Sequence, residues 1–253
     1  MVHVTTAQPS NFQSHVTEFV MRLVARQVEL TPDHHVGHTF IIGISSHERA
    51  LVLAVSQHTD AVGNLEGQEV EIRSPADAIA QGISLVPEDR KCQGLVLGMN
   101  CRDNMTLPQV GDLTAGPFVS GGAEIAIYDQ YRDRLDIRAS SWKQQVGNLS
   151  GGNQQKIVIG KWLSMHPRVL IVDEPTRGID VGSKSEIHKL IRELAAHGYA
   201  VIVISSEMPE VLHVSDRIVA MYSGRVMRTF TSEEVTEDKL IQAISGLTRE
   251  DAA

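Results

Sequence analysis

Ser150, Gly151 and Gly152 are the first residues whose types and spacing can do chemistry. They precede a predicted helix, in which apolar residues pair at i, i+4 spacing, as Val158 does with Trp162. Glycines at a helix start leave backbone N–H groups open to approach, and the helix dipole adds positive potential there. The pattern therefore suits a phosphate, although an ordinary serine N-cap accounts for the same residues without a ligand.

Two adjacent carboxylates, Asp173 and Glu174, are the second candidate for chemistry. They follow four apolar residues, Val169 to Val172, which is typical of a strand covered on both faces of a parallel sheet. Ligands of open α/β sheets bind at the carboxyl ends of such strands. Asp173 can hold Mg²⁺, directly or through water, and Glu174 can orient or deprotonate an attacking water. The alternative is a strand end with two solvated acids.

The elements around these acids are predicted to form a β-α-β unit over residues 169–204. A helix is predicted from about Ser183 to Ala196, followed by a second buried strand at Ala200–Ile204. The apolar residues of the helix recur at i, i+3, i+4 and i+7, at Ile187, Leu190, Ile191 and Leu194. The two strands are expected to be parallel, with a right-handed crossover between them.

The first half of the chain is less regular. β-Branched runs predict strands at Phe40–Ile44, Val70–Ile72 and Ile83–Val86, and Ser74 is expected to cap a helix that runs through Ala80. The glycine-rich residues 111–122 are predicted to be a loop before a helical stretch near residues 124–135.

Both ends of the chain add minor elements. An amphipathic stretch is predicted at Val16–Val28. Near the carboxyl end, we expect a short helix at Pro209–His213 and an exposed hairpin made of Arg217–Met221 and Arg225–Phe230.

Composition bounds the class of protein. The 253 residues are 42% apolar and 21% charged, as in soluble globular proteins, and the net charge of -8 argues against nucleic acid as the partner. Cys92 and Cys101 fit neither a zinc site nor a disulfide framework. His34, His35 and His38 have no acidic or cysteine partner at helical or strand spacing, so no metal site is predicted there. No apolar run approaches the roughly 20 residues that span a bilayer.

Three segments together resemble an ATP-binding cassette (ABC) ATPase. In order and spacing, Leu149–Lys156 is similar to the signature motif, Val169–Thr176 to the Walker B motif and Gly178–Asp180 to the D-loop. Further detail resembles the second cassette of the bacterial ribose-type sugar importers, at residues 73–78, 87–99, 153–156, 176–182 and 205–210. The resemblance covers about residues 65–246 well and 37–45 weakly.

The resemblance implies an α/β fold with a mostly parallel core sheet, an antiparallel β part and a helical subdomain at about residues 103–165. It divides the chain into an unassigned segment 1–36, a cassette domain 37–246 and a tail 247–253. The site residues that it implies are the following: Ser150, Gly151, Gly152 and Gln154 for ATP in the signature motif, Asp173 for Mg²⁺ through water, Glu174 as the catalytic residue, Asp180 in the D-loop, Glu88 at the Q-loop position and Ser206 at the switch position.

The sequence departs from the family at the P-loop. No glycine-rich turn with a Lys-Ser/Thr pair is found, and only nineteen residues separate Ser45 from Leu65, which is short for a strand, loop, full helix and strand. The family's Q-loop glutamine and switch histidine are replaced by Glu88 and Ser206. No aromatic residue is placed for adenine stacking. We therefore expect the chain's own nucleotide site to be weak or dead.

The signature half is expected to act on a partner. Cassettes of this family dimerise head to tail, so Ser150, Gly151 and Gly152 would close over ATP held by the P-loop of a second cassette, identical or different. The resemblance implies an ATPase subunit of a sugar importer that uses ATP and Mg²⁺. Transmembrane permease subunits would dock near Glu88–Met105 and would link it to a periplasmic sugar-binding protein, with the chain peripheral on the cytoplasmic face of the membrane.

Two alternatives differ in class. The chain can be a non-catalytic remnant of such a cassette that binds no nucleotide, which is motivated by the missing P-loop. A cassette ATPase of DNA repair would need a coiled-coil insertion, and the sequence has no heptad run.

Overall fold

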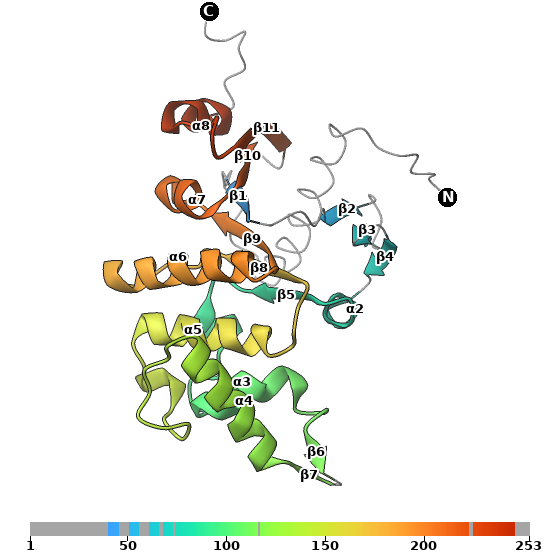
Figure 1. Cartoon of the computed structure of the whole chain (residues 1–253), viewed down its shortest axis with the longest axis vertical. Coiled ribbons are helices and arrows are strands. Elements are labelled where there is room, and N and C mark those ends of the chain that lie inside the picture. The colour runs from blue at the N-terminus through green and yellow to red at the C-terminus, as the bar shows by residue number, and fades with distance from the viewer. Residues whose placement is uncertain are drawn as a thin grey trace, which may run out of the picture. The chain divides into compact units, whose positions relative to one another are not determined.

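The computed structural model describes residues 40–45, 51–55, 61–65, 68–72, 74–115, 117–222 and 225–245 (Figure 1). The chain divides into two compact units, one formed by Gly82–Val203 and the other by segments before and after it. The predicted amphipathic stretch Val16–Val28 and the three histidines at positions 34, 35 and 38 lie outside the described residues.

The unit Gly82–Val203 contains a parallel pair of strands. β5 (Ile83–Val86) pairs with β8 (Val169–Asp173) in parallel, with Val86 opposite Val172. All five residues of β8 are buried, which explains its continuous apolar sequence. β9 (Ala200–Ser205) neighbours β8 on the other side, and α6 (Val181–Ala196) connects the two strands. The predicted strand-helix-strand order over residues 169–204 is confirmed.

The apolar face of α6 is the one that the sequence predicts. Its four periodic residues are at most 8% exposed: Ile187, Leu190, Ile191 and Leu194. The helix begins at Val181 rather than at about Ser183, because Asp180 caps its first turn through the backbone N–H of Ser183.

Three further helices belong to the same unit. They are α3 (Cys101–Thr106), α4 (Gly121–Arg134) and α5 (Gly151–Leu163). α5 contacts α3, α6 and β5, and Figure 1 shows it between α6 and the α3–α4 pair. Its first turn is therefore held on a buried helix, with Ile157, Val158 and Ile159 fully buried. Three short helical turns lie along the connections: η1 (Arg90–Gly94) between β5 and α3, η2 (Leu107–Gln109) after α3 and η3 (Val146–Asn148) before α5.

The predicted loop at residues 111–122 is wrong in part. β6 (Thr114–Ala115) and β7 (Phe118–Val119) pair in an antiparallel hairpin, and α4 starts at Gly121. Ser120 accepts a hydrogen bond from the backbone N–H of Ala123 at 3.4 Å. This N-cap starts the helix in spite of the two glycines that follow it.

The second unit contains two groups of antiparallel strands. β10 (Arg217–Tyr222) pairs with β1 (Phe40–Ser45) and with β11 (Arg225–Thr231). β2 (Leu51–Val55), β3 (Ala61–Leu65) and β4 (Gln68–Ile72) form a separate sheet, consistent with the expected antiparallel β part. α2 (Pro75–Ala80) follows, capped as predicted by Ser74, which accepts from the backbone N–H of Asp77 at 3.2 Å.

The hairpin at residues 217–230 is exposed only in part, contrary to the prediction, because residues 218–221 of β10 are buried while Arg228 of β11 is exposed. The side chains of residues 218–221 in β10 are at most 2% exposed. They contribute to a core with α7 (Met208–Val214) and α8 (Glu237–Ile244), and α8 was not predicted from the sequence. The buried members of this core are Val211, Ile218, Ala220, Phe230 and Leu240. Within the described residues, none of the helices combines the length and the apolar character that crossing a membrane requires.

Candidate functional site

The start of α5 presents the predicted phosphate-binding residues. Ser150 is the N-cap and is exposed, and its Oγ accepts from the backbone N–H of Asn153 at 3.4 Å and from Nδ2 of Asn153 at 2.9 Å. Gly151 is half-buried and Gly152 is buried. The helix N-terminus and its cap therefore lie at the surface, while the second glycine is covered by the protein.

Gln154 does not lie at that surface. Its side chain is 4% exposed, and its Nε2 donates to the carbonyl oxygens of Val146 at 3.2 Å and Leu149 at 3.3 Å. Its Oε1 accepts from Nε of Arg90 at 3.4 Å. Gln154 therefore holds the loop that leads into α5, and its amide is engaged inside the chain.

The two glycines are needed for packing within the chain. A Cβ atom on Gly152 would lie 2.6 Å from Cβ of Ser183, which is closer than real Cβ atoms approach. A Cβ atom on Gly151 would lie 3.2 Å from Cγ2 of Ile179 and 3.3 Å from the carbonyl oxygen of Gly178. The start of α5 is thus in close contact with the segment 178–183, and glycine permits that approach.

The turn after β8 carries the predicted acidic pair. Asp173 is 8% exposed and ends the strand. Glu174 has a φ of 43°, in the left-handed region, and its carbonyl accepts from the backbone N–H of Arg177 at 3.1 Å. Non-glycine residues in this conformation cost about 1 kcal/mol or more, so the turn is held against local strain.

The acidic pair is electrostatically unfavourable by itself. Burial, and after it the neighbouring charge of Glu174, together raise the pKa of Asp173 from its ordinary value of 3.8 to about 7. A divalent cation would relieve both effects, because carboxylate oxygens are the ligands that Mg²⁺ takes. In the part of the chain that the structure describes, no group of three or more His, Cys, Asp and Glu side chains forms a metal site. The two adjacent carboxylates fit a Mg²⁺ ion that keeps waters or phosphate oxygens as its other ligands.

Asp180, at the D-loop position, starts α6. One of its carboxylate oxygens accepts from the backbone N–H of Ser183 at 2.9 Å, and the other accepts from the Ser183 hydroxyl at 2.8 Å. The hydrogen bond from the Ser183 backbone lowers the pKa of Asp180. Asp180 is exposed, so the same carboxylate that caps α6 lies at the surface.

Arg90 is a site residue that sequence reasoning missed. It opens the π-helical turn η1, which Asp89 caps by accepting from the backbone N–H of Lys91 and Cys92. Arg90 is only 9% exposed, and it donates from Nη1 to the carbonyl oxygen of Arg177 at 2.7 Å and from Nη2 to that of Gly178 at 3.0 Å.

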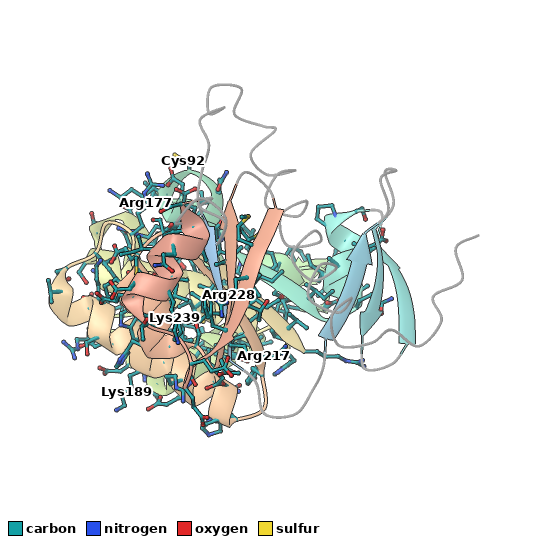
Figure 2. The ribbon with its side chains drawn as sticks, turned by 90° about the horizontal axis from the view of Figure 1, so that it is seen from above. Cys92, Arg177, Lys189, Arg217, Arg228 and Lys239 are labelled. Carbon is teal, nitrogen blue, oxygen red and sulfur yellow. The ribbon has the colours of Figure 1, made fainter. Side chains whose placement is uncertain are left out.

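The residue at the Q-loop position contacts the same segment. Glu88 is half-buried and forms an ion pair with the guanidinium of Arg177. Figure 2 labels Arg177 and also Cys92 of η1, the turn whose Arg90 donates to the Arg177 carbonyl. The Glu88 carboxylate is therefore engaged with the residue directly before Gly178 in its own chain.

Ser206, at the switch position, belongs to the other unit. It directly follows β9 and is exposed. The preceding residue, Ser205, is fully buried, and its hydroxyl accepts from the backbone N–H of Glu207 at 3.0 Å.

Comparison with known proteins identifies relatives along most of the chain. The family model described as "ABC transporter" matches residues 45–177, more than half of the chain. A ribose import ATP-binding protein of Rhizobium meliloti (strain 1021) is 44% identical over 196 residues, which are 78% of this chain and 39% of that protein. A second, from Geobacillus kaustophilus (strain HTA426), is 46% identical over 182 residues, 72% of this chain and 37% of that protein.

These comparisons also bear on length and fold. The chain spans about two fifths of the length of the curated relatives it matches. Among solved structures, an ATP-binding cassette of an ABC transporter superposes with a TM-score of 0.60 at 21% identity, covering 72% of this chain and 76% of that one. A dimeric cassette bound to ADP and Pi gives 0.57 at 18% identity, covering 69% and 74%. The α/β cassette fold implied by the sequence is therefore confirmed, and the chain belongs to the ABC transporter family.

Proposed function

We propose that this chain is an ATPase subunit of a bacterial ABC importer for ribose-type monosaccharides. In this proposal, it donates the signature half of a nucleotide site that a partner cassette completes. The observation that carries the proposal is the exposed N-terminus of α5, where Ser150 is exposed and Gly151 and Gly152 are in contact with the segment 178–183 of the same chain. A helix N-terminus of this kind attracts a phosphate through its free N–H groups and its dipole.

The other half of that site must come from a second cassette, of the same or a different chain. The sequence has no glycine-rich loop with Lys and Ser/Thr to cradle the β- and γ-phosphates. Ser150 and the backbone at Gly151 would contact the γ-phosphate of ATP that the partner's P-loop holds. Gln154 would act indirectly, because its buried amide fixes the loop before α5.

The acidic pair would serve the nucleotide site on the side of this chain. Asp173 would hold Mg²⁺, directly or through water, and Glu174 would orient or deprotonate the attacking water. When bound, Mg²⁺ would supply charge neutralisation at the phosphate oxygens. Without a P-loop in this chain, we propose that this site turns over slowly or not at all.

The sugar and the membrane partner are inferred from the relatives. Relatives that are 43–46% identical to this chain are named ribose import ATP-binding proteins, which supports that substrate class for the complex. Permease subunits would dock near Glu88–Met105, where Val96 is 45% and Leu97 38% exposed. The chain would thus lie peripherally on the cytoplasmic face of the membrane and would meet a periplasmic binding protein only through the permease.

An add-back experiment tests the proposal. A membrane complex of permease subunits and a P-loop-bearing partner cassette is prepared without this chain, and its ATPase rate is measured before and after the chain is added. We expect the rate to rise on addition and to saturate at a fixed ratio of the two cassettes. A rate that does not change on addition would contradict the proposal.

A further inference from the structure

We propose that Arg90 is a positioning residue that holds the signature helix and the D-loop segment as one rigid half-site. The inference rests on the proposed function, because the half-site acts on a nucleotide only when a partner cassette is present. It concerns a residue outside both motifs that lies more than fifty residues from either of them in the sequence.

The guanidinium of Arg90 joins two separate segments. Its Nη1 donates to the carbonyl oxygen of Arg177 (2.7 Å), directly before the D-loop segment, and its Nη2 donates to that of Gly178 (3.0 Å), the first residue of that segment. Its Nε donates to Oε1 of Gln154 in the first turn of α5 at 3.4 Å. A planar fork with donors on three nitrogens matches three acceptors at once, whereas the ammonium of lysine is a single point.

The surroundings of Arg90 are shaped for this contact. Arg90 is 9% exposed, and a Cβ atom on Gly151 would lie 3.0 Å from its Nη2. The first glycine of the signature motif therefore leaves room for the guanidinium as well as for the D-loop segment. Glu88, two residues before Arg90, adds an ion pair to the side chain of Arg177. Residue 177 is thus held by Arg90 through its carbonyl and by Glu88 through its side chain.

The mechanical consequence follows from where Arg90 lies. It opens η1, inside the segment proposed for permease docking, and a displacement of η1 would pull on the D-loop carbonyls and on Gln154 together. Hydrogen bonds from a charged donor are stronger than neutral ones, so these contacts resist separation. We expect Arg90 to preserve the shape of the half-site while the segment that carries it moves.

Hydrogen exchange in the isolated full chain tests the contact without any partner. Arg90→Met removes the donors with a similar side-chain length, and we expect amides in residues 177–183 to exchange about tenfold faster or more, since a charged hydrogen bond contributes roughly that factor. Arg132→Met is the matched control, because Arg132 is a partly exposed arginine that pairs with Asp129 and Asp133 on the surface of α4. It should leave residues 177–183 unchanged.

The ATPase of the complex with permease and partner cassette tests the consequence. Arg90→Met should lower kcat by about tenfold with little change in the KM for ATP, because the partner's P-loop still binds the nucleotide. Arg90→Lys should recover only part of the loss, and Arg132→Met should behave as wild type. A lower kcat with exchange raised at 177–183, alone or together with the first turn of α5 around Gln154, supports positioning. Exchange raised equally throughout Gly82–Val203, or unchanged at 177–183, overturns the inference.

The two proposals fail in different ways. If Ser150→Arg leaves the ATPase of the complex unchanged, the proposed function is wrong, whatever exchange shows. If Ser150→Arg abolishes the activity while Arg90→Met changes neither exchange nor kcat, the proposed function stands and the role of Arg90 is wrong.

Discussion

Ser183, near the start of α6, occupies the space that a side chain on Gly152 would need. Its Cβ lies 2.6 Å from the position of a Cβ atom on Gly152. The hydroxyl of Ser183 is held there by Asp180, which accepts its hydrogen bond at 2.8 Å. The second glycine of the signature motif and the N-cap of the helix after the D-loop therefore constrain each other through one serine.

Gly152→Ala should destabilise the protein because of this contact. We expect a loss of about 1–3 kcal/mol in the free energy of unfolding, since the extra methyl group meets Ser183 in a packed region. Ser183→Gly removes the opposing atoms, so the double variant should recover part of that loss. Denaturant titration of both single variants and the double variant measures the coupling.

Gly122→Ala is the control for this cycle, because a Cβ atom at Gly122 meets nothing within 4 Å. It should leave stability unchanged or raise it slightly, as alanine favours a helix over glycine. If Gly152→Ala were as well tolerated as Gly122→Ala, the close contact between α5 and α6 would be refuted.

Asp180 should have two separable roles, one as the N-cap of α6 and one in the ATPase activity of the complex. Asp180→Ala removes both acceptors for Ser183, and we expect it to lower the midpoint of thermal unfolding, as loss of an N-cap typically does. Asp180→Asn keeps an acceptor and should lower that midpoint much less. If the carboxylate charge also matters at the cassette seam, Asp180→Asn should still lower the ATPase rate of the complex. Thermal unfolding and ATPase assays on both variants separate the two effects.

Asp173 should make stability depend on pH in the absence of divalent cations. Its pKa is raised to about 7 by burial and by Glu174, against an ordinary value of 3.8. The folded state then binds more protons than the unfolded state between these two pH values. The contribution of Asp173 to the free energy of unfolding is therefore present at low pH and is lost as pH rises through about 7. From pH 5 to pH 8, we expect this residue to lower the free energy of unfolding by about 2–3 kcal/mol.

Asp173→Asn isolates that contribution, because other groups titrate alike in both proteins. Urea titrations in EDTA at pH 5, 6, 7 and 8 give the difference between wild type and variant. As pH rises, the variant should become more stable relative to wild type. A difference that stays constant over the range would show that the Asp173 carboxyl is not desolvated as the structure indicates.

The isolated chain should bind MgATP poorly. The sequence lacks the loop that supplies most phosphate contacts in such cassettes, and the signature residues reach a nucleotide only in a dimer. Isothermal titration of the chain alone should give no saturable heat at nucleotide concentrations that saturate a P-loop-bearing cassette. Tight binding by the chain alone would mean that a complete nucleotide site exists within it.

The sequence was sufficient to predict an element where its local residue pattern agrees with the burial of that element in the structure. The apolar run before Asp173 and the periodic residues of α6 predict a buried strand and an amphipathic helix, and both are confirmed. Residues 111–122 were misassigned in part, because glycine content outweighed the capping signal of Ser120. The prediction of an exposed hairpin at 217–230 failed because β10 packs against α8. That helix lies later in the chain and was not predicted.

The motifs of the candidate site can be identified in the sequence, but the contacts that hold these motifs together cannot. Ser150, Asp173 and Asp180 stand out in the sequence because their motifs are contiguous. Arg90 does not, because two of its acceptors are backbone carbonyls of residues 87 and 88 positions away, which no sequence pattern marks. The inward position of Gln154 is likewise a result of packing, because its amide donates to the backbone carbonyls of Val146 and Leu149.

The most direct test of the account is Ser150→Arg in the complex with permease and a P-loop-bearing partner. A bulky cation at the N-cap would block the start of α5, so the account predicts loss of nearly all ATPase activity attributable to this chain. Ser140→Arg, at another exposed serine of the same unit, should retain it, and unfolding curves of both variants check that each is folded. Wild-type ATPase activity in the folded Ser150→Arg complex would contradict the claim that this chain completes its partner's nucleotide site.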